Sequence, residues 1–252
     1  MKLPRIIPVL LLDGKSLVKT RRFKSPKYVG DPINIVKIFN EKRVDEIVIL
    51  DISKSYNSPK FELIKDIAGE CFIPLAYGGK ISDLDTASKI FELGFEKVIL
   101  NTSFFENPNL ITEIANKYGS QSVILSIDIK KNWLNKLQIY NHKYKFHKKD
   151  FKITELTNIA EELGAGELLV QMVHIEGTLE GPELINLDEL FPNRTIPLII
   201  SGGCSNINDI QSYFSNGADA VACGHMFTFY GPHEAVLITY PDLNDLRKIR
   251  FK

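Results

Sequence analysis

Short apolar runs alternate with segments of helical periodicity along the whole chain. The apolar runs are nearly continuous in Val, Ile and Leu, which is typical of parallel strands that are covered on both faces. We predict eight strands, at 5–11, 45–52, 73–76, 96–100, 122–128, 166–172, 196–200 and 218–222. Helices are predicted near 31–42, 59–70, 83–93, 107–118, 153–163, 183–191, 206–215 and 231–239.

This alternation predicts one α/β domain over residues 1–252, a (β/α)8 TIM barrel, with an open doubly wound sheet as the alternative. An internal repeat favours the barrel. Gly78-Gly79 follow the third strand and Gly202-Gly203 follow the seventh, and a helix, a glycine and another strand come after each pair at similar spacing. Two half-barrels of four strand–helix units each would produce this self-similarity.

Two segments interrupt the rhythm. Residues 12–30 are predicted to be a long basic loop after the first strand. Residues 130–148 are predicted to be an insertion after the fifth strand, with a small hairpin formed by Leu137–Tyr140 and Tyr144–Phe146. Both segments should lie at the C-terminal ends of the strands, where barrel enzymes carry their variable loops.

Composition and charge then narrow the function classes. The chain has 31 Lys+Arg and 31 Asp+Glu, so it has no general attraction for nucleic acid or anionic membranes. The apolar run near the N-terminus is too short to span a bilayer, and we read it as a buried strand rather than a signal peptide. Cys71, Cys204 and Cys223 form no CxxC pair. We therefore expect a cytoplasmic protein with no metal, cofactor, membrane span or nucleic-acid partner.

Glycine-rich turns at the predicted mouth are candidate phosphate sites, because they let backbone N–H groups approach a phosphate closely. Tight packing of the strand–helix turns is the alternative explanation. We define two grips by their residues. The first grip is Gly78 and Gly79 with Asn101 and Thr102, and the second grip is Ser201, Gly202 and Gly203 with Cys223 and Gly224.

Carboxylates at strand ends are the second candidate feature, since acid–base chemistry needs such groups on a rigid frame. Asp51, Asp128 and Glu176 occupy such positions. Asp128 ends the otherwise apolar run Val123–Ile127, although a solvated strand cap would explain it too.

Four charged residues stand at or near the opposite ends of the strands, and they are Arg5, Glu46, Lys97 and Glu167. Because strand residues alternate sides, Lys97 shares a side with Ile99 and Asn101, and Glu167 shares one with Leu169 and Gln171. If these sides face the interior, two cations and two anions meet at the barrel floor and satisfy one another. The alternative is that each charge turns out to water.

The sequence from Arg5 to about Phe229 resembles the cyclase subunit of imidazole glycerol phosphate synthase. The resemblance rests on Gly30-Asp31-Pro32, Asp45–Ile52, Asn101-Thr102, Glu106-Asn107-Pro108, Gly119-Ser120-Gln121, Ile127-Asp128, Gly164–Glu167, Glu176-Gly177-Thr178 and Ser201-Gly202-Gly203. It implies a phosphorylated ligand with two phosphate ends, one for each grip. It also implies a glutaminase subunit docked on the N-terminal face, and an ammonia gate formed by Arg5, Glu46, Lys97 and Glu167.

The mouth departs from the family pattern. The family uses aspartates on strands one and five as acid and base. Asp128 matches the second. Residues 7, 9 and 11 share the side of Arg5 by alternation, so Leu11 takes the place of the first, and Asp13 belongs to the Asp-Gly that follows. Lys80 replaces the third glycine of the first grip, and we count it with that grip. Glu176 replaces an aspartate, and His174 replaces another acidic residue.

Three functions follow from this combination. Losing one positioned acid–base group costs about 10²–10⁴-fold in rate. The pattern resembles divergent copies of the subunit that are associated with surface-polysaccharide gene clusters. The resemblance implies that such copies pass ammonia from a glutaminase toward a sugar amidotransferase, which forms an acetamidino group. The alternatives are a genuine cyclase (a lyase) of histidine biosynthesis, and a non-catalytic scaffold that binds a phosphorylated ligand and activates the glutaminase.

Overall fold

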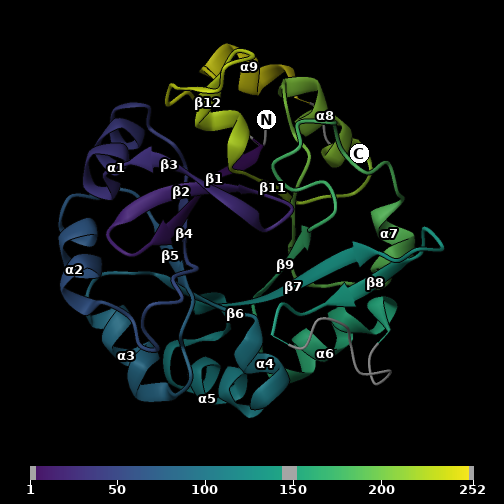
Figure 1. Cartoon of the computed structure of the whole chain (residues 1–252). Helices are drawn as coiled ribbons and strands as arrows, with labels where there is room; N and C mark the ends of the chain where they lie inside the picture. The colour runs from purple at the N-terminus through teal and green to yellow at the C-terminus, as the bar shows by residue number, and fades with distance from the viewer. Residues whose placement is uncertain (1–3, 144–151, 250–252) are drawn as a thin grey trace.

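The computed structural model describes residues 4–143 and 152–249, in which eight parallel strands close into a barrel (Figure 1). The barrel closes because β11 pairs in parallel with β1, with Arg5 opposite Ala220 and Pro8 opposite Cys223. The predicted fold is confirmed. The strands are β1 (Arg5–Asp13), β4 (Ile47–Asp51), β5 (Leu75–Gly78), β6 (Lys97–Leu100), β7 (Val123–Lys131), β9 (Glu167–Met172), β10 (Leu198–Ser201) and β11 (Ala220–Cys223).

Helices surround the barrel, and capping side chains define where several of them begin. Asp31 accepts a hydrogen bond from the N–H of Asn34 at 2.9 Å, and Pro32 fills the first helical position, where an N–H would have no helical partner. The helices that follow the barrel strands are α1 (Pro32–Glu41), α2 (Phe61–Gly69), α3 (Leu84–Glu92), α4 (Thr102–Glu106), α5 (Asn109–Tyr118), α6 (Leu156–Leu163), α7 (Leu187–Leu190) and α8 (Ile207–Ser215).

The helix predicted at 231–239 is wrong. The chain there forms a turn at Gly231, flanked by the antiparallel pair β12 (Phe229–Tyr230) and β13 (Ala235–Val236). The N–H groups of Leu237 and Thr239 donate to carbonyls of the preceding segment at 2.9 and 3.0 Å, which holds the run extended. A short helix, α9 (Leu243–Lys248), comes later instead. The helix predicted at 183–191 is reduced to α7, because the side chain of Asn186 caps it only at Leu187.

The segment predicted as a long loop at 12–30 is a β-hairpin, so that expectation is also wrong. Its arms are β2 (Ser16–Arg21) and β3 (Lys24–Gly30), and β2 pairs antiparallel with the end of β1. Residues 17–20 of β2 are buried, whereas 24–28 of β3 are exposed. The hairpin lies across the front of the barrel in Figure 1.

A second hairpin follows the fifth barrel strand. Its arms are the end of β7 and β8 (Leu137–Tyr140), which pair antiparallel with Asp128 opposite Tyr140. The other arm that we expected, Tyr144–Phe146, lies outside the described residues. Leu137–Tyr140 therefore pairs with the barrel strand itself.

Side chains from alternate strand positions fill the barrel interior in layers. The apolar layer holds Ile7, Val9, Val48, Ala76, Ile99, Ile124, Leu169, Ile199, Ala220 and Ala222, with Leu11 and Leu50 packed against it. Because strand residues alternate, this layer fixes what lies at each end of the axis. Arg5 lies on the same side of β1 as Ile7, and Asp128 lies on the same side of β7 as Ile124. Among the described residues, the polar groups of the interior therefore lie at its floor and its mouth, which frames the candidate sites.

Candidate functional site

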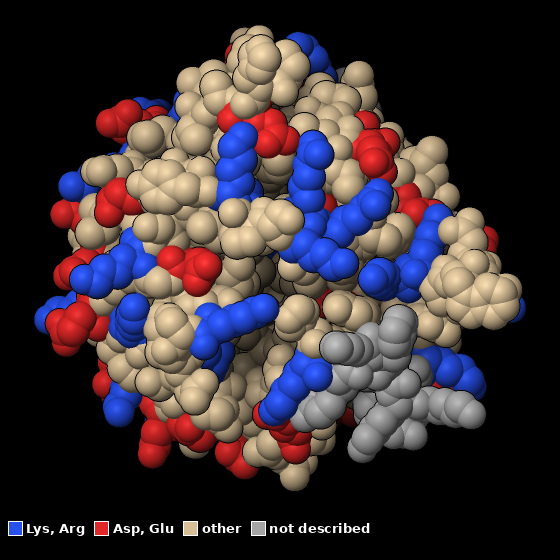
Figure 2. All heavy atoms as spheres, in the orientation of Figure 1, with Lys and Arg blue, Asp and Glu red and all other residues tan. Residues whose placement is uncertain are grey.

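A cavity of about 760 Å³ opens at the C-terminal ends of the strands, and we call it the mouth cavity. It is visible as the hollow near the centre of the face in Figure 2, with Lys and Arg side chains around it. Its walls come from the ends of β1, β4, β5, β6, β7 and β9, from the β2–β3 hairpin and from the turn after β5. The lining includes Leu11, Phe23, Asp51, Tyr56, Gly78, Gly79, Lys80, Asn101, Thr102, Asp128, Lys143 and Gln171.

Every residue of the first grip lines this cavity, and Lys80 is one of them. Lys80 has a positive φ of 59°, a backbone region that costs a non-glycine residue about 1 kcal/mol or more. Its Nζ lies 2.9 Å from Oδ1 of Asp51, a side chain that is fully buried. The hydroxyl of Tyr77 donates to the other carboxylate oxygen of Asp51 at 3.1 Å, and the ring of Tyr56 lies 4.8 Å from Nζ. The lysine thus brings a cation to the wall that glycine alone could not supply.

Burial also shifts the acidity of this cluster. Loss of water contact raises the pKa of the Tyr77 hydroxyl above its ordinary value, and the nearby charge of Asp51 raises it further. Tyr77 therefore stays protonated and serves as a donor that holds the Asp51 carboxylate in place. The contacts of these two tyrosines with Asp51 were not predicted from the sequence, because nothing local in a buried Leu-Ala-Tyr run indicates that a hydroxyl will meet Asp51.

Asp128 is the carboxylate at the axis of the mouth. Nε2 of Gln171 donates to its Oδ1 at 3.2 Å, and the side chain is almost completely buried. Burial raises the pKa of Asp128 to about 7, although hydrogen bonds from Asn101 and Gln171 act in the opposite direction. Such a group can either release or accept a proton near neutral pH. Leu11 also lines the cavity, beside Leu50 on the next strand, as the alternation predicted.

The second grip does not line the mouth cavity. The buried Lys19, on the β2–β3 hairpin, reaches over it: Nζ donates to the carbonyl of Val9 and lies where a side chain on Gly224 would be. Burial lowers the pKa of Lys19 to about 8. Glu176 lies beside it, with Oε2 accepting from the hydroxyl of Ser201 at 3.4 Å. Burial raises the pKa of Glu176. An ammonium thus lies against Gly224 and a carboxyl group against Ser201, whereas Gly202 and Gly203 pack against Met172, Ile175 and Gly181.

His174 is separate from the mouth cavity. Its Nε2 lies 2.9 Å from Oε2 of Glu183, which also forms an ion pair with Lys131 at 2.6 Å. This group ties the loop after β9 to the second hairpin.

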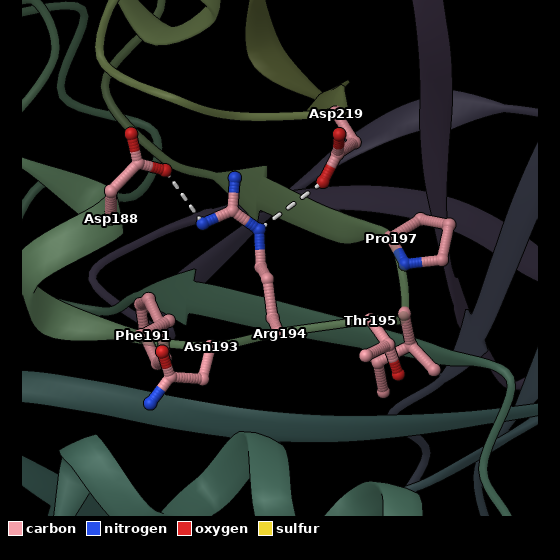
Figure 3. A pocket seen from close by; sticks show the side chains of 8 residues that line it. Asp188, Phe191, Asn193, Arg194, Thr195, Pro197 and Asp219 are labelled. Atoms are coloured by element: carbon pink, nitrogen blue, oxygen red, sulfur yellow. Dashed lines mark hydrogen bonds and ion pairs between the residues drawn. The ribbon is translucent and has the colours of Figure 1, made fainter.

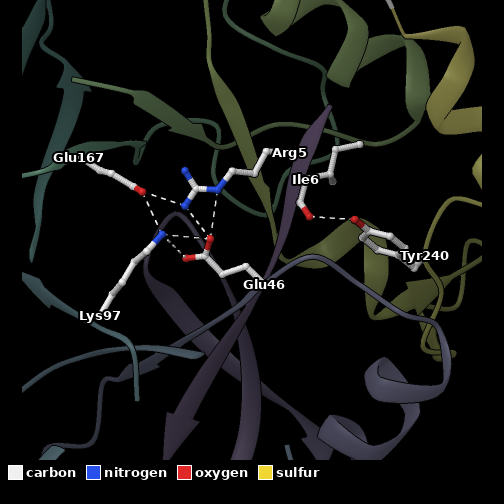
Figure 4. A network of polar contacts seen from close by, with 6 residues as sticks. All are labelled: Arg5, Ile6, Glu46, Lys97, Glu167 and Tyr240. Carbon is white, nitrogen blue, oxygen red and sulfur yellow. Dashed lines mark hydrogen bonds and ion pairs between the residues drawn. The ribbon is translucent and has the colours of Figure 1, made fainter. Parts of the chain in front are cut away.

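The four predicted floor charges meet in a closed ring at the opposite end of the axis (Figure 4). Nη2 of Arg5 lies 2.5 Å from Glu46 and 2.8 Å from Glu167, while Nζ of Lys97 lies 3.4 Å from Glu46 and 2.9 Å from Glu167. Each cation therefore contacts both anions. Burial alone would lower the pKa of Arg5, but its hydrogen bonds and the charges of Glu167 and Glu46 raise it. The interior arrangement holds, and the outward-facing alternative is excluded.

A second cavity, of about 450 Å³, lies near the N-terminal ends of β10 and β11 (Figure 3). Its charged groups are already paired, because Arg194 contacts Asp188 at 2.8 Å and Asp219 at 3.4 Å. We therefore do not assign it a ligand. The part of the chain that the structure describes holds no cluster of His, Cys, Asp and Glu suited to a metal ion. Among those residues, no helix is long and apolar enough to cross a membrane.

Comparisons with known proteins give the family. A family model described as "Histidine biosynthesis protein" matches residues 5–233. Over 247 residues the chain is 44% identical to a Pseudomonas aeruginosa protein named "Putative imidazole glycerol phosphate synthase subunit hisF2", which covers 96% of this chain and 97% of that protein. Over 228 residues it is 37% identical to the "Imidazole glycerol phosphate synthase subunit HisF" of Chlorobium limicola, with 89% and 90% covered.

Proposed function

The chain belongs to the histidine biosynthesis protein family, and from this premise we propose that it is the barrel subunit of a glutamine-dependent system of the imidazole glycerol phosphate synthase type. It receives ammonia from a glutaminase on its N-terminal face and passes it along the barrel axis to the mouth. We further propose that the ammonia serves to amidinate an N-acetylated sugar in surface-polysaccharide biosynthesis, through a sugar amidotransferase.

One observation carries this proposal, namely the contrast between the two ends of the axis. The floor keeps a complete ring of Arg5, Glu46, Lys97 and Glu167, with all four neighbouring pairs in contact. The mouth has one axial carboxylate, Asp128, because Leu11 fills the position of the other. A buried ring of four charges is costly to hold unless it is well paired, and it is weak support for stability alone. Its retention beside an incomplete mouth favours a conduit over a catalyst.

The interior above the ring suits a small neutral molecule. An ammonium ion would lose its hydration in the apolar layer at a large free-energy cost, whereas ammonia would not. We expect the interior to be least filled near Ala76, Ala220 and Ala222, because their side chains are the smallest of the layer. Of the two cations of the ring, Lys97 can move more easily than Arg5, because its single ammonium on a flexible side chain can leave one glutamate while it stays paired with the other. We infer that its displacement opens the floor.

Genuine cyclase activity is the second candidate, and one observation favours it. The pKa of Asp128, raised to about 7 by burial, would let this side chain act as acid or base at neutral pH. The covered second grip and Leu11 weigh against a ligand with two phosphate ends.

The test is reconstitution with the glutaminase. In one assay, the purified complex is given the phosphorylated ribonucleotide of the histidine pathway and ammonium chloride, and cyclised product is measured. In the other, it is given glutamine, a nucleotide-linked N-acetylated amino sugar and the sugar amidotransferase, and amidine is measured. We expect amidine without cyclisation. Cyclisation at a rate typical of the family, or rescue of a histidine auxotroph, would favour the cyclase. If the barrel merely stimulates glutamine hydrolysis and neither product forms, it is a scaffold.

A further inference from the structure

The two hairpins beside the mouth differ from the rest of the chain in charge. Residues 14–30 contain six Lys or Arg and no Asp or Glu, and residues 130–143 contain four Lys and no Asp or Glu. The whole chain has 31 Lys+Arg and 31 Asp+Glu. Because these two segments hold ten cations and no anion, the rest of the chain carries a net negative charge. Figure 2 shows Lys and Arg side chains gathered on this face. Charge is therefore sorted onto the mouth face.

Part of this charge is used within the protein. Arg21 and Lys27 pair with Glu234 at 3.1 and 3.0 Å, and Arg22 pairs with Glu180 at 3.4 Å. These contacts, with Lys131 and Glu183, fasten both hairpins to neighbouring loops. Within residues 4–143 and 152–249, however, Lys15, Lys24, Lys130 and Lys136 form no ion pair. None of these four lines the mouth cavity. A small anion seated in that cavity is thus not the ligand of these lysines.

The second hairpin also presents a rigid apolar tip. Trp133 is 90% exposed and Leu134 is 53% exposed. The side-chain oxygen of Asn132 accepts from the N–H groups of Leu134 and Lys136 at 2.9 and 3.0 Å, which fixes the turn. Exposed tryptophan on a preorganised turn is typical of the anchors that dominate protein–protein interfaces, with charged groups around them setting orientation and association rate.

We propose that this surface, formed by Lys15, Lys24, Lys130, Trp133, Leu134 and Lys136, docks a protein whose acceptor site is framed by Asp and Glu. This rests on the proposed function, because the enzyme that consumes the ammonia must cover the mouth to exclude water. Its acidic frame complements the lysines, and an apolar pocket on it receives Trp133. A membrane fits less well, because the tip of the first hairpin turns its apolar residue, Phe23, into the mouth cavity rather than outward.

The experiment measures binding of the purified barrel–glutaminase complex to the sugar amidotransferase at low and moderate salt. We expect Trp133→Ala, and separately the triple change Lys15→Glu, Lys24→Glu and Lys136→Glu, to weaken binding by roughly tenfold or more. The matched control reverses Lys42, Lys65 and Lys89, which are exposed at the C-terminal end of α1 and on α2 and α3, and should leave binding within about twofold. If the two triple variants bind the amidotransferase with equal affinity, the proposed docking surface is wrong.

Two further readouts separate the alternatives. Vesicles of phosphatidylcholine with phosphatidylglycerol serve as the membrane probe, and binding to them that is lost with Trp133→Ala would replace the protein partner by a membrane. Glutamine-dependent amidination at saturating amidotransferase tests the proposed function separately. If amidine forms but both variants bind like the unaltered chain, only the docking surface is wrong. If no amidine forms at any concentration, the proposed function itself fails.

Discussion

Replacing Lys97 by alanine removes one of the two cations of the floor ring. Glu46 and Glu167, whose side chains are 5% and 10% exposed, would then share Arg5 alone. Breaking a buried ion pair by removing one partner typically costs about 3–5 kcal/mol. Because Arg5 and Lys97 are 26% and 18% exposed at the floor, water offsets part of this, and we expect about 3 kcal/mol. With an ordinary dependence on urea, that corresponds to a midpoint about 1–2 M lower.

The charge balance of the ring supplies a sharp control. In the double variant Lys97→Met and Glu167→Gln, Arg5 and Glu46 remain as a neutral pair, so most of the lost stability should return. Lys89→Ala, on the outside of α3, should leave the urea midpoint unchanged. Function is followed as amidine formed per glutamine hydrolysed, which should fall in Lys97→Ala while hydrolysis continues. An unaltered midpoint together with an unaltered ratio would mean that the four residues act neither as a unit nor as a gate.

Three other substitutions test the mouth. Asp128→Asn should remove a pH dependence of stability. Because burial raises the pKa of Asp128 from 3.8 to about 7, its contribution to stability is fully present below about pH 4 and is lost as the pH rises through 7. In urea melts at pH 8 the variant should therefore be more stable than the wild type by about 2–4 kcal/mol. Leu11→Asp should raise cyclisation of the ribonucleotide by about 10²-fold if the missing carboxylate is what limits it, and no gain in a steady-state assay would count against that account. Lys80→Gly relieves about 1 kcal/mol of backbone strain but strands the buried Asp51, so urea unfolding should show a net loss of about 1–3 kcal/mol, and calorimetry should show weaker binding of a phosphorylated ligand.

The sequence was informative wherever a period or a local cap decides the structure. The barrel followed from runs that are apolar on both faces, and the start of α1 followed from Asp31 and Pro32. The side of β1 that Arg5 and Leu11 share followed from alternation alone. The β2–β3 hairpin was missed because residues 24–28 are exposed and include two lysines and a proline, so their pattern does not differ from that of a loop.

Contacts between distant segments were beyond local patterns. Lys19 and Gly224 are far apart in the chain, and only the folded hairpin brings them together. The helix expected at 231–239 failed because of a nearer contact, since carbonyls of the segment just before Gly231 hold that run extended. Lys80 in the Gly-Gly-Lys run of the first grip could be noticed from the sequence, because a lysine in a position that favours glycine indicates that its side chain has a function.

The two grips show how a repeated sequence can yield two different sites. Gly79 packs against the end of β4 and Gly202 against the end of β9, so the two half-barrels place equivalent turns alike. The residue that follows is Lys80 in one turn, with φ of 59°, and Gly203 in the other, with φ of 77°. The β2–β3 hairpin then covers only the second grip, where Glu176 adds a carboxyl group. Each grip thus has one lysine and one carboxylate beside it, Lys80 with Asp51 at the first and Lys19 with Glu176 at the second. The two half-barrels are therefore alike in their turns, but only the first grip opens into the mouth cavity, because the β2–β3 hairpin places Lys19 against the second.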